Sequence, residues 1–124
     1  MARVLLCDDS AFMRMMLKTT LVALGHRIVG EAGDGEQAVE KYEELLPDLV
    51  TMDITMPNVS GIEAVTRIRA KDQNACIVMV SALGQQAIIN EALEAGAKDF
   101  IVKPFVPEQI AAVLDRVLNP KKPA

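Results

Sequence analysis

The sequence predicts an α/β fold, in which a doubly wound parallel sheet carries helices on both faces. Apolar strand-like segments alternate with amphipathic helical segments five times along the chain, and such alternation is typical of βαβ units. The strand-like segments are almost continuously apolar, as expected for strands covered on both faces. The 124 residues suffice for one core. We therefore expect a single domain over residues 1–120, followed by a frayed tail over residues 121–124.

The first two strands are expected on either side of a helix. Residues 3–7 form a short apolar strand, Ser10 is a good helix N-cap, and Gly25 supplies the stop. The apolar side chains at helical spacing, which we expect to be buried, are Met13, Met16, Leu17, Leu21 and Leu24. Residues 28–32 form a weaker strand, interrupted by Gly30, that suits the edge of a sheet.

The middle of the chain contains the next two helices and the third strand. Pro47 ends the first of these helices. Its inner side chains are expected to be Ala38, Val39, Tyr42, Leu45 and Leu46. The third strand follows at residues 49–52, and a loop around Pro57 leads into the next helix. The inner side chains of that helix are expected to be Ile62, Val65 and Ile68.

The last two strand–helix units complete the alternation. Residues 76–80 form an apolar strand, the following helix runs from about residue 85 to residue 95, and Gly96 is a good stop. Its inner side chains are expected to be Ile88, Ile89, Ala92 and Leu93. Residues 100–102 form the fifth strand, and Pro107 suits the first position of the last helix. The inner side chains of the last helix are expected to be Ile110, Val113, Leu114, Val117 and Leu118.

Composition and charge exclude several classes of function. A net charge of −4 and a pI of about 5.0 argue against nucleic acid as the direct partner. No apolar run reaches the roughly 20 residues that span a bilayer, and the N-terminus lacks a signal-peptide pattern. Cys7 and Cys76 have no metal or redox spacing, and His26 stands alone. We expect a cytoplasmic protein that binds neither nucleic acid nor membrane.

Polar side chains stand at the ends of four of the five predicted strands. Asp8 and Asp9 follow the first strand, Asp53 the third, Ser81 the fourth and Lys103 the fifth. Each of these residues alone is most often a turn former, a helix cap or a surface charge. In a parallel sheet, however, the carboxyl ends of all strands share one edge, where ligands bind. We therefore predict that these five side chains form one site.

The residue types at this edge favour magnesium-dependent phosphoryl transfer. Three neighbouring carboxylates repel one another unless a cation lies among them. Oxygen-only ligands favour a hard ion such as Mg²⁺, which prefers carboxylates together with phosphate oxygens. The Lys103 ammonium and the Ser81 hydroxyl can bind a phosphoryl group. A carboxylate that attacks phosphorus gives an acyl phosphate, and we predict that Asp53 is this nucleophile.

These motifs resemble the receiver domains of two-component response regulators over essentially the whole chain. The motifs that match are Asp8-Asp9, Asp53, Met56-Pro57 with Gly61, Ser81-Ala82 and Lys103-Pro104-Phe105. The resemblance implies a flavodoxin-like sheet with strand order 2-1-3-4-5. Residues 12–17, 81–86 and 95–100 are similar, more narrowly, to stand-alone chemotaxis regulators of the CheY type. Ser81 departs from the pattern, because threonine is commoner there.

The resemblance also implies a role for each matching residue. Asp53 is the phosphoacceptor, and Ser81 and Lys103 bind the phosphoryl group. The implied Mg²⁺ ligands are Asp9, Asp53 and the backbone carbonyl of Thr55, with Asp8 contributing through water. Ser81 and Phe100 form the switch pair, in which Phe100 takes the aromatic position. The bond before Pro104 is implied to be cis, which only proline tolerates at low cost.

The partners implied by the resemblance are those of a signalling switch. A histidine kinase donates the phosphoryl group. The surface of the fourth helix, fifth strand and fifth helix then binds the flagellar motor switch protein or another output protein. A dedicated phosphatase is a further partner compatible with the resemblance. The protein is expected to catalyse only its own phosphorylation and autodephosphorylation, and not to be an enzyme for other substrates.

Three alternatives compete with this interpretation. A phosphorelay intermediate would pass its phosphoryl group on to a histidine, and sequence alone barely separates it from a chemotaxis regulator. A small Mg²⁺-dependent phosphohydrolase is disfavoured because Thr55 stands where such enzymes generally place a second acidic residue. A flavodoxin-like cofactor binder is disfavoured because Asp8 and Asp9 would repel a flavin phosphate. Nucleotide-binding glycine motifs are absent from the sequence.

Overall fold

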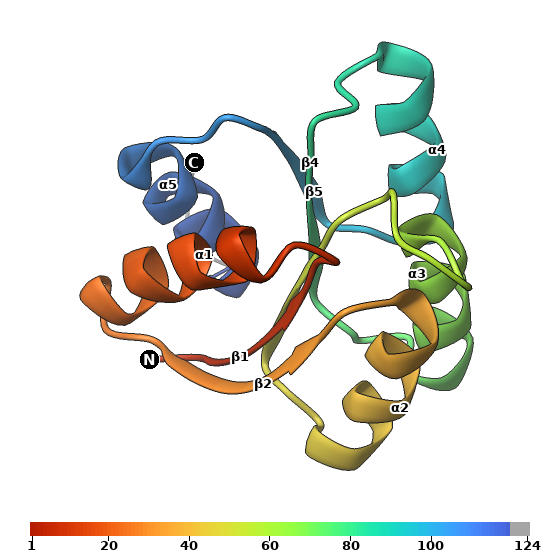
Figure 1. The fold of residues 1–124 in the computed structure, drawn as a ribbon, viewed down its shortest axis with the longest axis horizontal. Helices are drawn as coiled ribbons and strands as arrows, with labels where there is room; N and C mark the ends of the chain where they lie inside the picture. Colours follow the sequence, from red (N-terminus) through yellow and green to blue (C-terminus); the bar gives the residue numbers. More distant parts are fainter. Residues whose placement is uncertain (120–124) are drawn as a thin grey trace.

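Five strands and five helices alternate over residues 1–119, the part of the chain that the computed structural model describes (Figure 1). The strands are β1 (Arg3–Cys7), β2 (Arg27–Ala32), β3 (Leu49–Met52), β4 (Ile77–Ser81) and β5 (Asp99–Val102). The helices are α1 (Ala11–Ala23), α2 (Gly35–Leu45), α3 (Gly61–Lys71), α4 (Gln86–Ala95) and α5 (Pro107–Leu118). The predicted alternation is confirmed, and the expected frayed tail lies outside the described residues.

The strands form one parallel sheet in the order β2-β1-β3-β4-β5. This is the predicted order, with β2 at the edge as its interrupted apolar pattern indicated. Helices α1 and α5 cover one face, while α2, α3 and α4 cover the other (Figure 1). The chain reverses its winding direction between β1 and β3, so the carboxyl ends of these two strands border the crevice where ligands bind in such sheets.

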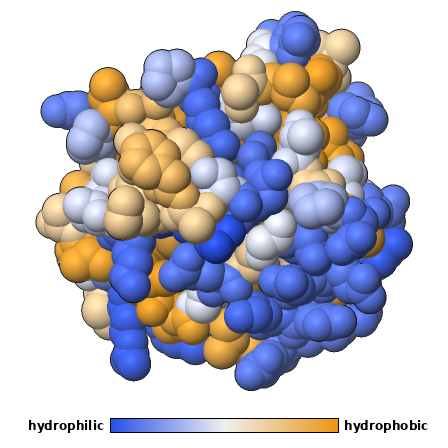
Figure 2. Space-filling view, viewed as in Figure 1, coloured by the Kyte–Doolittle hydropathy of each residue, from blue (hydrophilic) through white to orange (hydrophobic). Residues whose placement is uncertain are grey.

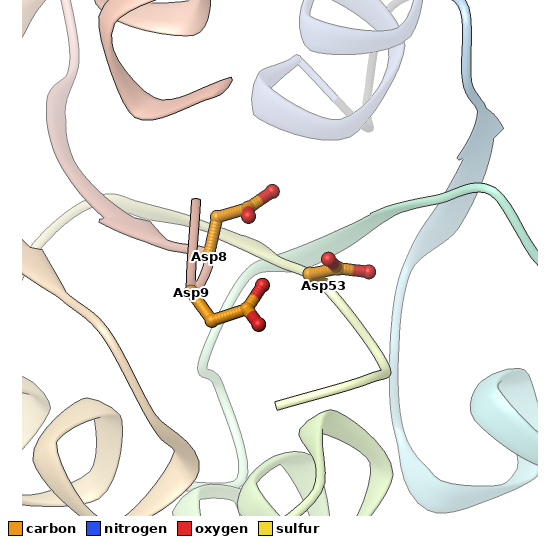
Figure 3. A group of neighbouring side chains, drawn as sticks. All are labelled: Asp8, Asp9 and Asp53. Atoms are coloured by element: carbon orange, nitrogen blue, oxygen red, sulfur yellow. The ribbon is translucent and has the colours of Figure 1, made fainter. Parts of the chain in front are cut away.

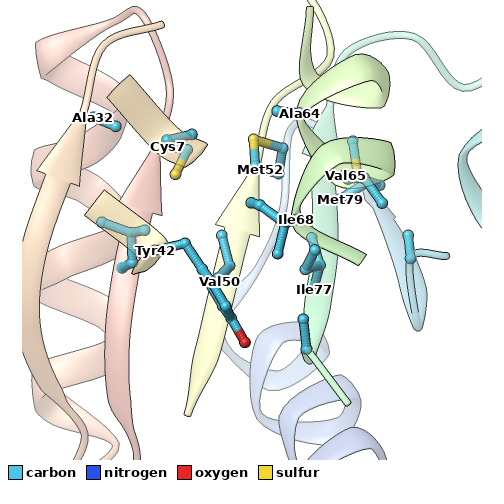
Figure 4. Close-up of a cluster of buried hydrophobic side chains, with 14 of the residues drawn as sticks. Cys7, Ala32, Tyr42, Val50, Met52, Ala64, Val65, Ile68, Ile77 and Met79 are labelled. Carbon is cyan, nitrogen blue, oxygen red and sulfur yellow. The ribbon is translucent and has the colours of Figure 1, made fainter. Parts of the chain in front are cut away.

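Each face of the sheet has its own aliphatic core. Leu5, Val50 and Met52 pack with α2, α3 and α4, whereas Val4 and Leu6 pack with α1 and α5. Figure 4 shows Val50 and Met52 on the face of the sheet that α3 covers. The alternation follows from the two-residue period of a strand. Burial on both faces explains why the strand segments read as continuous apolar runs. No helix in the described part of the chain is both long enough and apolar enough to cross a membrane.

Part of the predicted helix burial is wrong. The side chains expected inside but found exposed are Met16 (40%), Leu24 (38%), Leu46 (63%) and Leu93 (41%). In α1 only Leu17 and Leu21 are buried, and in α4 only Ala92. Helical spacing alone does not identify the buried arc, since more than half of a folded protein's surface is apolar. Figure 2 shows this mixture, with apolar residues among the polar ones on the visible face.

Candidate functional site

Three carboxylates meet at the carboxyl edge of the sheet (Figure 3). Asp8 and Asp9 directly follow β1, and Asp53 directly follows the neighbouring strand β3. One oxygen of each carboxylate lies within 4.8 Å of the others. Asp8 and Asp53 are 1% and 8% exposed, whereas Asp9 is open to solvent. The structure thus brings together three acidic residues that the sequence separates by up to 45 positions.

Lys103 places a positive charge between two of these carboxylates. Its Nζ donates hydrogen bonds to Asp8 Oδ2 at 2.8 Å and to Asp53 Oδ2 at 3.2 Å. Burial acts to lower the pKa of Lys103, but the hydrogen bond to Asp8 and the charge of Asp53 outweigh it and leave that pKa raised. The side chain is therefore a cation that offsets carboxylate repulsion. The peptide bond to Pro104 is cis, as the resemblance implied.

Ser81 is the fifth member of the group at this edge. It ends β4 between the ends of β3 and β5, and it is 1% exposed. Its hydroxyl accepts a hydrogen bond from the Leu83 N–H at 3.2 Å, and its carbonyl accepts one from the Lys103 N–H at 2.9 Å. Phe100 lies in β5, where its half-buried side chain packs against the core on the α2–α4 side. Ser81 and Phe100 therefore occupy adjacent strands.

A glycine allows α3 to begin against the backbone of Asp53. The Gly61 N–H donates to the Ile54 carbonyl at 2.8 Å. A Cβ on Gly61 would lie 1.8 Å from the carbonyl oxygen of Asp53, far inside van der Waals contact. Asp53 also accepts the N–H of Ile54 on its own Oδ1 at 2.7 Å. These backbone contacts fix where the strand ends and therefore where the Asp53 carboxylate lies.

The turn after β1 is held from both sides. The Asp8 N–H donates to the Ala32 carbonyl at 3.0 Å, and Asp8 Oδ1 accepts the Ser10 N–H at 2.9 Å. The Arg14 guanidinium donates to the Asp8 carbonyl and, at 2.9 Å, to Glu31 Oε1 on β2. Sequence reasoning did not find Arg14, because nothing in a helical arginine indicates that its side chain turns back to the preceding strand.

The acidic residues fit a hard divalent cation. Three carboxylates supply oxygen donors without thiolate or imidazole, a set that suits Mg²⁺. The exposed position of Asp9 leaves room for the water ligands that Mg²⁺ keeps. Thr55, whose carbonyl the resemblance implies as a ligand, is an exposed residue in the loop after β3, two positions beyond Asp53. These residues can hold Mg²⁺ beside the Asp53 carboxylate.

The family comparison identifies the class of protein. The family model described as the response regulator receiver domain matches residues 4–115. The chain therefore belongs to the response regulator receiver domains, and its flavodoxin-like fold agrees with that assignment.

Relatives within this family include chemotaxis proteins. The chain is 56% identical over 115 residues to the chemotaxis protein CheY of Thermotoga maritima, covering 93% of this chain and 96% of the relative. A chain of the CheX–CheY–BeF3–Mg²⁺ complex from Borrelia burgdorferi aligns with a TM-score of 0.91 and 39% identity, covering 93% and 87%. The receiver domain of a Pseudomonas aeruginosa sensor histidine kinase, with magnesium coordinated in its active site cleft, aligns with a TM-score of 0.87 and 28% identity, covering 95% and 98%. The chain is thus a CheY-like receiver domain of a two-component system.

Proposed function

We propose that this receiver domain is a phosphorylation-activated switch in which Asp53 accepts a phosphoryl group from a histidine kinase. The observation that carries the proposal is the cluster of Asp8, Asp9 and Asp53, in which the Lys103 ammonium is paired with Asp8 and Asp53. A nucleophilic carboxylate, further carboxylates for a metal and a cation for phosphate oxygens are what phosphoryl transfer requires. The proposed location is the cytoplasm, where histidine kinases present their phosphohistidine.

The proposed reaction transfers one group between two residues. An Asp53 carboxylate oxygen attacks the phosphorus of a phosphohistidine, a P–O bond forms, and the P–N bond breaks with its electron pair returning to the imidazole. Lys103 moves its hydrogen bond from the Asp53 carboxylate to a phosphoryl oxygen, and the Ser81 hydroxyl donates a hydrogen bond to another. Asp9, Asp53 and the Thr55 carbonyl would hold Mg²⁺, with Asp8 acting through water. When bound, the ion neutralises charge on the phosphoryl oxygens.

The proposed response follows from the Ser81 contact. When the Ser81 hydroxyl turns to the phosphoryl group, it leaves the Leu83 N–H, and the half-buried Phe100 ring moves inward. A bias of about 1–3 kcal/mol between two states is the usual scale of such coupling. The output surface is formed by α4, β5 and α5, where Leu93, Val102 and Val106 are already exposed. The partner proposed for this surface is the flagellar motor switch protein, with a dedicated phosphatase as a further partner.

Two measurements test this proposal in sequence. A purified chemotaxis histidine kinase labelled with radioactive ATP should transfer its label to this protein in the presence of Mg²⁺. Phosphorylated protein should then bind a motor switch peptide more tightly than unmodified protein. Transfer without a change in peptide affinity, combined with onward transfer to a histidine phosphotransfer protein, would favour the phosphorelay alternative. Rapid turnover of small phosphate esters would favour the phosphohydrolase.

A further inference from the structure

A side-chain hydrogen bond ties the start of α2 to the loop between β3 and α3. Asn58 Nδ2 donates to Asp34 Oδ2 at 3.1 Å, although the residues are 24 positions apart. A backbone bond lies next to it, from the Gly35 N–H to the Val59 carbonyl at 3.0 Å. The two segments touch closely, since a Cβ on Gly35 would lie 2.1 Å from that carbonyl oxygen. The loop is therefore fastened to α2 at two consecutive residues.

Asp34 is held rigidly because it also caps the helix. Its Oδ1 accepts the Gln37 N–H at 2.8 Å, which satisfies one of the free donors of the first turn. The second oxygen of the same carboxylate is the one that receives Asn58. Asn58 in turn has a left-handed backbone with φ of 66°, a conformation that asparagine tolerates better than most residues. Asp34 therefore cannot shift without also losing the cap of α2.

The loop that Asp34 holds carries Thr55. One end of the loop is fixed where the Gly61 N–H meets the Ile54 carbonyl, and the other where Asn58 meets Asp34. Thr55 lies between these two anchors, two residues after Asp53. Mg²⁺ requires nearly ideal octahedral geometry, so a carbonyl ligand in a loop must be held in place before the ion binds. Groups that orient a metal ligand without touching the metal contribute strongly to affinity.

We infer that Asp34 is a positioning residue for the metal site, acting through Asn58 to hold the Thr55 carbonyl. The inference rests on the proposed function and deepens it, because a loose loop would weaken Mg²⁺ binding and slow phosphoryl transfer to Asp53. Among the described residues, no hydrogen bond or ion pair joins the Asp34 side chain to Asp8, Asp9 or Asp53. The effect of Asp34 is transmitted through one side-chain hydrogen bond and the backbone between Asn58 and Thr55.

Two substitutions at the same position separate the hydrogen bond from the helix cap and from the charge. Asp34→Ser and Asp34→Asn both remove the negative charge, and both keep an oxygen that can cap α2. Only the asparagine side chain also carries an amide that can bond to Asn58, whose own amide can turn to accept it. Asn58→Gly removes the bond from the other side while tolerating the positive φ.

Isothermal titration with Mg²⁺ measures the effect, with urea unfolding to verify that each variant is folded. We expect Asp34→Ser and Asn58→Gly each to bind Mg²⁺ more weakly, by up to about fivefold, because ordering the released loop costs no more than the one hydrogen bond contributed. Asp34→Asn should bind like the wild type. The double variant Asp34→Ser/Asn58→Gly should be no weaker than either single variant, because both remove the same contact.

Two results would overturn the inference. Unchanged Mg²⁺ affinity in both Asp34→Ser and Asn58→Gly would show that the loop needs no such anchor. Equal losses in Asp34→Ser and Asp34→Asn would show that the charge matters and the hydrogen bond does not. Measurements on the wild type distinguish a failure of the proposed function from a failure of the role given to Asp34. If it neither binds Mg²⁺ nor accepts a phosphoryl group on Asp53, the proposed function fails, and this inference fails with it. If it does both while the variants match it, only the role of Asp34 is wrong.

Discussion

The ammonium of Lys103 lies 2.8 Å from the carboxylate of Asp8, although 95 positions separate the two residues in the sequence. The same ammonium reaches Asp53 Oδ2 at 3.2 Å, so it lies against both buried carboxylates of the cluster. In the unmodified protein Lys103 is therefore a counter-ion for buried carboxylates. On phosphorylation, as proposed, it becomes a ligand of the new anion.

Replacing Lys103 should lower stability and strengthen metal binding together. Lys103→Met keeps much of the apolar stem but leaves Asp8 and Asp53 without their cation. Removing one partner of a buried ion pair lowers the free energy of unfolding by about 3 kcal/mol. Urea unfolding without Mg²⁺ should show this loss, and added Mg²⁺ should recover part of it. Because the pKa of Lys103 is raised, its contribution is complete below the ordinary lysine pKa and disappears only as pH rises through the raised value. Equal stability of the two proteins near neutral pH would contradict this role.

Asp9 should matter for the metal and little for the fold. It is the one exposed carboxylate of the three, so Asp9→Ala should change the free energy of unfolding by less than about 0.5 kcal/mol. The same change should weaken Mg²⁺ binding at least tenfold by calorimetry, or by about 1.4 kcal/mol. Glu94→Ala, which removes an exposed carboxylate from α4, is the matched control and should leave Mg²⁺ affinity unchanged. A similar affinity for both variants would remove Asp9 from the ligand set.

Gly61→Ala should displace the backbone of Asp53, the proposed phosphoacceptor. The added methyl would collide with the Asp53 carbonyl, and backbone on both sides must shift. We expect a loss of at least about 2 kcal/mol in urea unfolding, together with slower phosphoryl labelling of the folded fraction. Gly33→Ala is the control, because the nearest atom to its added methyl is the Arg14 guanidinium at 3.8 Å. Equal losses of stability in the two variants would show that the close approach of α3 to Asp53 does not cause the loss in Gly61→Ala.

His26 should make the protein less stable in mild acid. Burial is the larger cause of the lowered pKa of His26, and the positive charge of the N-terminus is the smaller one. The Nδ1 of His26 accepts the Ala2 N–H at 3.0 Å, so this nitrogen must be unprotonated. A histidine with a lowered folded-state pKa stabilises the fold above its unfolded pKa, and this contribution is lost as pH falls through the folded value. Thermal unfolding between about pH 7.5 and pH 5 should therefore show a steeper decline for the wild type than for His26→Gln. Equal declines in the thermal stability of the two proteins would contradict this role of His26.

The sequence predicted the edge of the sheet better than the contacts made there. Chain topology forces Asp53, Ser81 and Lys103 to the same edge once the strands are parallel, so the strand ends alone sufficed. The pairing of Lys103 with Asp8 depends on the path of a long side chain across the sheet, which no local pattern encodes. The bond from Asn58 to Asp34 is likewise encoded by no local pattern, because the two residues lie 24 positions apart in the sequence.

Burial on the helices was the weakest part of the sequence prediction. Leu93 has helical spacing like its buried neighbour Ala92, yet it points to solvent. Helix α4 lies beside α3 and the edge strand β5, and these two elements cover only a narrow arc of its surface. Spacing can identify an apolar stripe, but the width of the buried arc depends on neighbouring elements that are distant in the sequence.

The most direct test of the proposed switch is to find where a phosphoryl group attaches. The protein is incubated with phosphoramidate and Mg²⁺, the acyl phosphate is trapped by reduction, and peptides are mapped by mass spectrometry. We predict modification at Asp53, dependence on Mg²⁺, and complete loss in a folded Asp53→Asn variant. Labelling that persists at another residue in that variant, or none in the wild type, would contradict it.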